Sequence, residues 1–507
     1  LNEKFEDPIK NLYSLYLKKK RFKQVLLCAN KLMKIDKSNH RYNYQLAFAL
    51  ELNNNFNEAI KYYKICIDFN NNDKKKSLNN IGSIYLKISK PKIALGYFRQ
   101  AIELGEDKII VNNLLKCYIK LRDIDKANLY YKKAQKIDKD YIEFIFNKVE
   151  YLILKNQIKD ALIILEKNKN KSKFLISLLR LLFNVGKNDE GKKLLTQSKK
   201  DNEQSPDFFN YFSLRLLYDG NFEDGWKYYE HRLAKKINYF NNIKEWAGEN
   251  IEKKNIIVFS EQGLGDCIQF SKYLIPLTQI AKNVTFVTQN KLLNLFRKKI
   301  KNLSIDVIEN CKNQKFDFKI TLGSLIKFFF KEKINNNESL IQSNRVNDLK
   351  WKNKFSNSKM NIGLVWSGSF NGTNEPYRSI PLSSLKKILS LNANFYCLQN
   401  EIWDRDLDFF RSTNLIDYGK LNLDEIASII NNLDLVITVD TSILHLSASL
   451  NKETWGLFSL NPDWRWGEFN KFNPYKSLNI FKQKTFNEWN DIEDQIYEKL
   501  KKKLILS

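Results

Sequence analysis

Seven segments of the amino-terminal half share one pattern that recurs at a nearly constant interval. In each of them a small or branched apolar residue is followed by apolar residues at helical spacing, as in NFNEAIKYYKICID from Asn55 and KPKIALGYFRQAIEL from Lys90. A repeat of this length predicts stacked pairs of helices, because one pair cannot bury its apolar face alone. The recurring positions lie 34, 35, 33, 34, 30 and 34 residues apart and are Val25, Ala59, Ala94, Ala127, Ala161, Gly191 and Gly225.

Other columns of the repeat agree with this interval. Ala47 and Gly82 lie twelve residues before their anchors, and Tyr63 and Phe98 lie four after them. A period of 34 with small residues at helix contacts is typical of tetratricopeptide repeats. We therefore predict an α-solenoid of tetratricopeptide repeats over residues 1–235, with a concave groove. Two roles stay open for it: a scaffold or dimerisation element, or a groove that receives a protein or an extended acceptor.

The carboxy-terminal half has a different pattern. After Gly248 short apolar, β-branched runs alternate with amphipathic segments, which predicts parallel sheets built from βαβ units. A polar linker, NRVNDLKWKNKFSNSKMN, separates two blocks and predicts domains over 251–345 and 358–507. Two such domains facing a cleft bind ligands at the carboxyl ends of their strands. The predicted strands are 255–259, 284–288, 318–322, 361–366, 394–398, 434–439 and 453–458.

Composition excludes several classes of protein. The net charge is +27, but only 13 of the 84 basic residues are arginine, and Lys, Asn and Ile are abundant throughout. This favours a general compositional bias over a nucleic-acid-binding face, and a nucleic-acid partner is not expected. No uninterrupted apolar run approaches the ~18 residues of a membrane span. Six scattered cysteines without a CxxC pattern indicate buried thiols in a reducing compartment, and three histidines exclude a His-rich metal site.

The first candidate site is the GLGD loop, from Gly263 to Asp266, which follows the predicted strand 255–259. A dinucleotide fingerprint needs a third glycine at position 268, which is Ile, and no P-loop sequence is present. An acid at this place would repel a pyrophosphate. Gly263 and Gly265 instead predict a tight turn and a close approach of the backbone to a ligand. Asp266 is either a base facing a sugar hydroxyl or the cap at the first residue of a helix.

The second candidate site follows the run DLVITV. Asp440, Thr441 and Ser442 open the segment SILHLSASL, which is predicted to be a helix with His445 on its first turn. Backbone N–H groups at a helix start, with hydroxyl groups nearby, bind phosphate well. The alternative is that Asp440 only caps the helix and that His445 is a packed helix residue.

The third candidate site is the loop WSGSFNGTNEPYRSIPL, which begins at Trp366. Ser367, Gly368 and Ser369 follow a predicted strand, and Arg378 comes later in the same loop. Such a loop can fold over a diphosphate, with Arg378 supplying a bidentate positive charge. The alternative is an ordinary polar loop in which Arg378 makes a local salt bridge.

These loops, taken in order, resemble a known group of enzymes. The order EQGLGDCIQFSKYL, GLVWSG, RSIPL, DLVITVDTSILHLSASL and NPDWRW is similar to family nine glycosyltransferases, the relatives of ADP-heptose:lipopolysaccharide heptosyltransferases. More closely, the chain resembles the branch in which tetratricopeptide repeats precede that domain. The resemblance implies a GT-B fold of two Rossmann-like α/β domains facing a cleft. The carboxy-terminal domain would hold the nucleotide sugar and the amino-terminal one the acceptor.

The resemblance also implies roles for individual residues. Asp266 matches the family's catalytic aspartate, and Asp440 matches its sugar-contacting aspartate. Arg378 matches a cationic position that is more often lysine in the heptosyltransferases. The segment 398–401 matches the region that meets the ribose or the base. The implied donor-binding residues are Ser367, Gly368, Ser369, Arg378, Gln399, Glu401, Asp440, Thr441, Ser442 and His445.

The expected function is transfer of a sugar from a nucleotide sugar to a glycan or protein acceptor, with inversion and with Asp266 as base. No cofactor besides the donor and no metal are expected. Asp404-Arg405-Asp406 formally makes a D-x-D metal motif, but we expect it to begin an exposed helix. The expected location is the bacterial cytoplasm, with peripheral attachment to the inner membrane as an alternative.

The DWRW group and the chain as a whole each allow two interpretations. The group DWRW, residues 463–466, either stacks on donor or acceptor or packs between the domains. The alternative function for the whole chain is a non-catalytic tetratricopeptide adaptor, in which a degenerate transferase domain binds partner proteins. Retention of Asp266, Arg378 and Asp440 together favours the enzyme.

Overall fold

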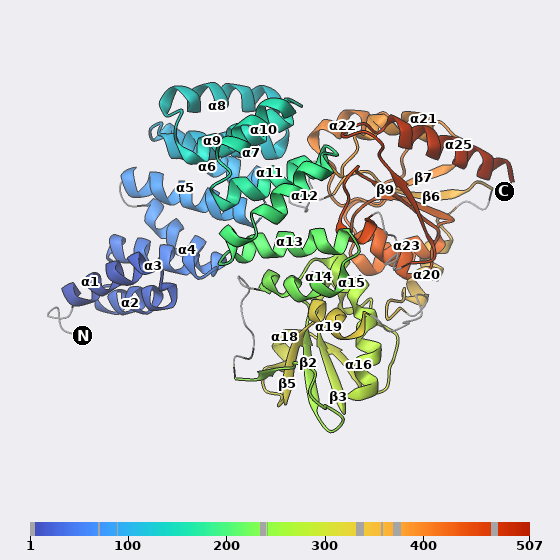
Figure 1. The fold of residues 1–507 in the computed structure, drawn as a ribbon, viewed down its shortest axis with the longest axis horizontal. Helices are drawn as coiled ribbons and strands as arrows, with labels where there is room; N and C mark the ends of the chain where they lie inside the picture. Colours follow the sequence, from blue (N-terminus) through green and yellow to red (C-terminus); the bar gives the residue numbers. More distant parts are fainter. Residues whose placement is uncertain are drawn as a thin grey trace. The chain divides into compact units, whose positions relative to one another are not determined.

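The computed structural model describes residues 6–68, 71–88, 90–233, 240, 242–330, 339–355, 358–368, 377–467 and 475–506 (Figure 1). The chain divides into two compact units, Leu1–Phe174 and Leu175–Ser507. This division falls inside the helical region, so the last helices of that region belong to the unit that contains both sheets. The domain ranges 1–235, 251–345 and 358–507 stay predictions.

The first unit consists of helices joined pairwise by short turns, as tetratricopeptide repeats require. The predicted anchor positions lie on the second helix of each pair, and their side chains are all fully buried. At Gly82 an added Cβ would lie 2.7 Å from the Phe98 ring, so the close contact between these helices needs a small residue. The helices are α1 Glu6–Lys18, α2 Phe22–Ile35, α3 His40–Leu52, α4 Phe56–Ile67, α5 Asn71–Lys87, α6 Pro91–Glu103, α7 Lys108–Leu121, α8 Ile124–Ile137, α9 Ile142–Leu154 and α10 Ile158–Lys167.

The repeat pattern continues into the second unit. Gly191 and Gly225 again mark close helix contacts, since an added Cβ would lie 2.8 Å from Phe183 and 2.5 Å from Leu217. The prediction of a helical repeat through this segment is confirmed. Helix α11 spans the boundary between the units. The elements are α11 Ser172–Asn184, α12 Asn188–Gln197, the 3-10 turn η2 Lys200–Asn202, α13 Pro206–Tyr218, α14 Phe222–Tyr229 and the 3-10 turn η3 Glu230–Leu233.

The first lobe of the second unit is built on a parallel five-stranded sheet. Its order is β1-β5-β2-β3-β4, so β2 lies in the middle and the chain leaves it on one side and returns on the other. The sequence missed β1, which is only two exposed residues, and β4, which is polar and partly exposed. The strands are β1 Lys244–Glu245, β2 Asn255–Phe259, β3 Asn283–Val287, β4 Leu303–Asp306 and β5 Phe318–Thr321.

The helices of the first lobe are short. The predicted single helix after the GLGD loop is instead interrupted by a 3-10 turn between α15 and α16. The elements are α15 Leu264–Phe270, η4 Ser271–Tyr273, α16 Leu274–Ile280, α17 Asn290–Leu293, α18 Ile308–Cys311, α19 Leu322–Phe329 and α20 Arg345–Lys352.

The second lobe contains another parallel five-stranded sheet, in the order β10-β9-β8-β6-β7. The order reverses at β6, which pairs with β7 on one side and β8 on the other. Ligands bind α/β sheets where the order reverses, because the loops after the two diverging strands leave a crevice there. The strands are β6 Asn361–Val365, β7 Asn394–Cys397, β8 Leu435–Val439, β9 Thr454–Phe458 and β10 Leu478–Lys482, and the last of these was missed from the sequence.

The connections of the second lobe complete the two Rossmann-like domains that the GT-B prediction requires. They are η5 Leu382–Leu385, α21 Lys386–Leu389, α22 Asp404–Arg411, α23 Leu423–Asn432, α24 Ser442–Ser449, η6 Trp464–Trp466 and α25 Asn490–Leu506. The fold class is thus confirmed: a helical repeat region followed by parallel-sheet α/β domains of GT-B type.

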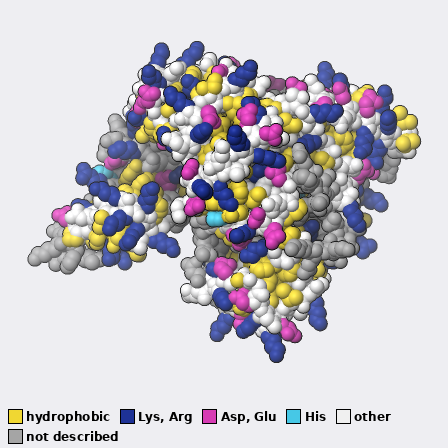
Figure 2. Space-filling view, viewed as in Figure 1, with side chains coloured by type: hydrophobic (Ala, Val, Ile, Leu, Met, Phe, Trp, Pro, Cys, Tyr) yellow, Lys and Arg dark blue, Asp and Glu magenta, His cyan; other side chains and the backbone are white. Residues whose placement is uncertain are grey.

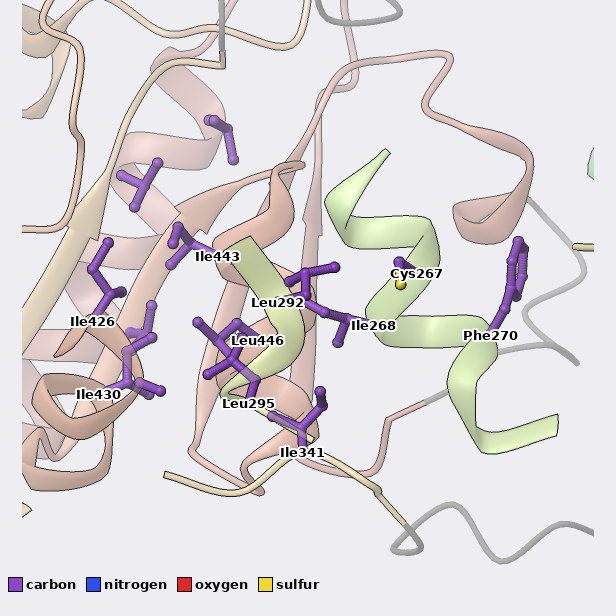
Figure 3. Close-up of a cluster of buried hydrophobic side chains, with 14 of the residues drawn as sticks. Cys267, Ile268, Phe270, Leu292, Leu295, Ile341, Ile426, Ile430, Ile443 and Leu446 are labelled. Carbon is purple, nitrogen blue, oxygen red and sulfur yellow. The ribbon is translucent and has the colours of Figure 1, made fainter. Parts of the chain in front are cut away.

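Apolar side chains join the two lobes beside the predicted site. Figure 3 shows Ile268 of α15 and Leu292 of α17 in one buried cluster with Ile426 of α23 and Ile443 of α24. Burying such side chains is favourable by ~1.5–3 kcal/mol each relative to exposure. The start of α15 is therefore held against the start of α24 by the core itself.

The surface carries its charge in dispersed form. On the face shown in Figure 2, Lys and Arg side chains are scattered among acidic, apolar and other groups rather than gathered in one patch. Within the described residues, no helix is both long enough and apolar enough to pass through a bilayer.

Candidate active site

The GLGD loop carries Asp266 from the end of β2 onto α15. The helix begins at Leu264, with Gly263 as its cap, so Asp266 is its third residue and not its first as predicted. The physical reason is that Oδ2 of Asp266 reaches back to accept a hydrogen bond of 3.0 Å from the Gly263 N–H. An acid at this position satisfies an N–H that the helix leaves unpaired. The other carboxylate oxygen, Oδ1, accepts a hydrogen bond from Arg465.

Gly265 lies at a close approach between the two lobes. An added Cβ would lie 2.6 Å from Cδ2 of His445 on α24. The predicted close approach of the backbone is therefore made to a packed histidine of the other lobe. His445 is buried, and its Nδ1 lies 3.0 Å from the Tyr475 hydroxyl. Burial lowers the pKa of His445 to about 3, so this ring is neutral at pH 7.

Arg378 and Asp440 meet at the carboxyl end of β8. Nη1 of Arg378 donates a hydrogen bond of 2.8 Å to the backbone oxygen of Asp440. The cap of α24 is Thr441, whose Oγ1 accepts a hydrogen bond of 3.3 Å from the Ile443 N–H, and not Asp440 as the alternative interpretation had it. The side chain of Asp440 is thereby left out of the capping of this helix.

Asp440 is an acid held in an unfavourable electrostatic environment. Burial, followed by the negative charge of Asp463, raises the pKa of Asp440 to about 6. Arg378 and Arg465 act in the opposite direction. A carboxyl group whose pKa is raised by burial and by a like charge is a common feature of functional sites.

The DWRW group places a buried arginine beside Asp266. The Nη1 of Arg465 donates a hydrogen bond of 2.6 Å to Asp463, Nη2 donates to Asp266, and Nε donates to Gln269. Trp464 packs against Trp226 with ring centroids 5.1 Å apart and also against Phe270. These contacts are the ones expected if the DWRW group packs between the domains. Sequence reasoning missed Arg465, and the signal that could have found it is its position between two tryptophans, which favours burial.

A cavity of about 440 Å³ opens beside these loops. Six of the predicted donor-binding residues line it, from the loops after β6, β7 and β8. From the first lobe, Leu264 and Lys291 reach it. The lining residues are Leu264, Lys291, Val365, Ser367, Gly368, Leu398, Gln399, Asn400, Glu401, Leu421, Asn422, Leu423, Ile426, Thr441, Ser442 and Ile443.

Gln399 holds the turn after β6 in place. Its Oε1 accepts hydrogen bonds of 2.7 and 2.8 Å from the N–H groups of Trp366 and Ser367, and its Nε2 donates to Ser367 Oγ and to the Glu401 backbone oxygen at 3.0 Å each. The amide is thus used within the protein. The Gly368 N–H is bonded to Ser379 Oγ at 3.0 Å. Ser369 lies outside the described residues.

The D-x-D sequence has a structural use. Asp406 is 2% exposed, although an exposed helix start was expected. Its Oδ2 accepts a hydrogen bond of 3.1 Å from the Trp366 indole, and its Oδ1 accepts one of 3.0 Å from the Leu382 N–H. In the part of the chain that the structure describes, no group of three or more His, Cys, Asp and Glu side chains is arranged to hold a metal ion.

Comparison with known families addresses the same loops. Residues 396–496 match the model of glycosyltransferase family 9 (heptosyltransferase), and this range contains the loops after β7 and β8. This part of the chain is therefore similar to a family 9 glycosyltransferase domain. Residues 40–73 and 110–141 match the model of the tetratricopeptide repeat. The predicted resemblance is confirmed for both parts, while Asp266 and Arg378 lie outside the matched range of the glycosyltransferase domain.

Solved structures give the following similarities. The glycosyl transferase family 9 structure from Veillonella parvula DSM 2008 is 15% identical, covers 51% of this chain and 99% of its own, and has a TM-score of 0.38. The E. coli ADP-heptose LPS heptosyltransferase II is 10% identical, covers 50% and 99%, and has a TM-score of 0.37. A tetratricopeptide repeat protein from Parabacteroides merdae ATCC 43184 is 12% identical, covers 47% and 95%, and has a TM-score of 0.38. No curated protein matches the chain.

Proposed function

We propose that this protein is an inverting, metal-independent glycosyltransferase that moves a sugar from a nucleotide sugar to a hydroxyl group of a glycan or protein. One observation carries the proposal. Asp266, Arg378 and Asp440 come from three separate loops, and Arg465 joins the first of them to the lobe that holds the other two. Asp266 of one lobe therefore meets Arg465 of the other, and the neighbouring Gly265 lies against His445 of α24.

Asp266 is the base in this proposal. The acceptor oxygen forms a bond to the anomeric carbon on the face opposite the leaving group, while the bond to the diphosphate breaks. Asp266 takes the proton of the hydroxyl group, and a base of this kind contributes about 10²–10⁴ in rate. Each carboxylate oxygen of Asp266 keeps a second lone pair besides those used by Gly263 and Arg465, which leaves room to accept this proton.

The second lobe supplies the donor site. Arg378 and the N–H groups at the start of α24 stabilise the charge that develops on the departing diphosphate. Ser367, Gly368 and Glu401 line the cavity of about 440 Å³, a size that suits the rest of a nucleotide. In this role Gln399 supports the cavity wall through its four hydrogen bonds within the protein.

Other features of the chain support a proposal for the acceptor and the compartment. A tetratricopeptide region binds extended chains in its groove, which favours a macromolecular acceptor. All six cysteines are free and buried, as suits a reducing compartment. We therefore place the reaction in the bacterial cytoplasm, with attachment to the inner membrane face as the alternative.

The decisive experiment compares wild type with Asp266→Asn. This change keeps the shape of the side chain but removes the base, so we expect kcat to fall by about 10²–10⁴ with donor affinity unchanged. Arg378→Ala should weaken donor binding in calorimetry. Full turnover in the Asp266 variant would refute the base assignment. A wild-type protein that neither transfers nor hydrolyses any nucleotide sugar would instead support the adaptor alternative.

A further inference from the structure

Arg465 is held more completely than an arginine that only packs. Its side chain is 7% exposed, and its Nε, Nη1 and Nη2 atoms each donate a hydrogen bond to a different partner. The guanidinium lies over the Phe270 ring at 5.0 Å and over the Trp464 ring at 4.5 Å, so two aromatic groups pack against the ion. These three hydrogen bonds together fix the orientation of the planar ion.

The partners of Arg465 come from both lobes. Asp266 and Gln269 lie on α15 of the first lobe, whereas Asp463 lies beside Arg465 in the second. A charge-assisted hydrogen bond of this kind fixes geometry as well as charge. The carboxylate of Asp266 is thereby clamped between the Gly263 N–H on one oxygen and Arg465 on the other.

The positive charge of Arg465 and the burial of Asp266 have opposite effects on the pKa of Asp266. Burial raises the pKa of Asp266, and the positive charge of Arg465 lowers it. Without that charge, Asp266 would be protonated over a wider pH range and could not accept a proton. The other charged or ionisable groups that act on Asp266 are Asp463, Glu261, Tyr229, Cys267 and Tyr475.

We propose that Arg465 is a positioning residue for the reaction, which orients the Asp266 carboxylate and balances its charge from the opposite lobe. This inference rests on the proposed function, because it assigns a partner to the base of that reaction. The inference goes beyond the proposed function in one respect: Asp266 is held ready to act as base only when the second lobe supplies Arg465. Asp463 competes with Asp266 for the same guanidinium and repels Asp266.

The test is the pH dependence of kcat in two variants with opposite expected shifts. Arg465→Gln removes the positive charge, so the acid limb of the profile should move up by about one pH unit, with kcat reduced by up to about 10-fold at pH values below the limb and recovered at higher pH. Asp463→Asn removes a competing negative charge, so the limb should move down. A purely structural role would lower kcat equally at all pH values and would not give shifts of opposite sign.

Three controls make the result decisive. Arg215→Gln removes another buried arginine, which pairs with Asp219 at 2.8 Å and lies over the Phe183 ring at 4.0 Å without touching Asp266. We expect it to lose stability but to keep the acid limb of wild type. Arg378→Gln tests whether the acid limb reports the titration of Asp440 instead, because the positive charge of Arg378 lowers the pKa of Asp440. If the limb belongs to Asp440, it should move in this variant. Arg465→Lys keeps the charge and should restore the limb toward wild type.

The outcomes separate this inference from the proposed function. An active wild type whose acid limb is unmoved in both folded variants overturns the role of Arg465 and leaves the proposed function standing. A wild type without transfer or hydrolysis overturns both. If Arg465→Gln does not fold, the downward shift in Asp463→Asn decides alone, and its absence is equally fatal to the proposal.

Discussion

Asp440 carries a negative charge in a place where both burial and Asp463 oppose it. The protein gains no capping bond from this side chain, since Thr441 caps α24. Residues whose charge costs stability are typical of functional sites, where unfavourable charge is offset elsewhere in the fold. The unfavourable charge of Asp440 therefore supports a role for this residue in binding the donor.

The cost of Asp440 predicts a stability difference that depends on pH. The folded pKa is about 6 and the ordinary value is 3.8, so the folded state binds the proton more tightly and wild type loses stability as pH rises through this window. Asp440→Asn should raise the free energy of unfolding by about 1–3 kcal/mol above pH 6. The gain should vanish near pH 4. Denaturant unfolding of both proteins across this range measures the difference.

The matched control is Asp408→Asn, because the Asp408 side chain is 99% exposed. Its effect should stay below about 0.5 kcal/mol at every pH. A gain for Asp440→Asn that does not change with pH would contradict the electrostatic cause.

Gly265 gives a second prediction at this scale. Ala at this position would place its Cβ 2.6 Å from His445, which is held by Tyr475 and cannot move away freely. Gly265→Ala should therefore destabilise the second unit by about 1–3 kcal/mol, as overpacking of a tight contact does. Gly96→Ala is the control, because no atom lies within 4 Å of the added Cβ, and a helical glycine replaced by alanine gains about 0.5–1 kcal/mol. Equal effects in thermal unfolding would refute the steric argument.

At the scale of elements, the last helices of the repeat region hold the loops of the site. The Tyr229 hydroxyl at the end of α14 donates a hydrogen bond of 2.9 Å to Gln262 in the GLGD loop. Arg232 of η3 pairs with Glu261 at 2.9 Å, and both side chains are less than 10% exposed. At Gly467, after η6, an added Cβ would lie 2.4 Å from the Tyr218 backbone oxygen of α13. The turns that carry Asp266 and Arg465 therefore both rest on α13, α14 and η3.

This support predicts a large effect of Arg232→Gln. Removing one partner of a buried ion pair leaves Glu261 uncompensated, which costs roughly 3–5 kcal/mol. We expect this loss in the free energy of unfolding of the second unit, measured with denaturant. Lys387→Gln is the control, since Lys387 and Asp494 form a pair of 2.8 Å with both side chains more than 60% exposed. A loss no larger than that of the exposed pair would show that the contact does not support the loop.

At the scale of the whole molecule, the chain is not divided where its sequence pattern changes. The pattern changes near residue 248, but the two compact units meet between Phe174 and Leu175. The reason is that α13 and α14 bury their side chains in the same core as the two sheets, through Leu217, Trp226 and Tyr229.

This division predicts how donor binding affects unfolding. A nucleotide sugar at about one hundred times its Kd should stabilise the unit that binds it by about 2.7 kcal/mol. In calorimetry or limited proteolysis, the second unit should be protected and the first unit should unfold as before. Protection of both units to the same degree would show that they unfold together.

The repeat, the alternation of strands and helices, and the three loops could all be predicted from the amino-acid sequence. These follow from local periodicity, which depends on the spacing of apolar residues along the chain and is visible in any one segment. The sequence also placed Asp266, Arg378 and Asp440 in loops that follow strands. Strands β1, β4 and β10 were not predicted from the sequence. Their apolar pattern is weak, and their pairing depends on neighbours that are distant in the chain.

The contacts of those loop residues, in contrast, could not be predicted before the fold was known. The pairing of Asp266 with Arg465 spans 199 positions, and the approach of Gly265 to His445 also joins separate lobes. No local pattern encodes such a contact, since it arises when two cores pack and bring their loop ends together. The raised pKa of Asp440 and the neutral state of His445 likewise come from burial by residues remote in the sequence. Charge and geometry at this site are therefore properties of the assembled fold, whereas the choice of residue types is a property of the chain.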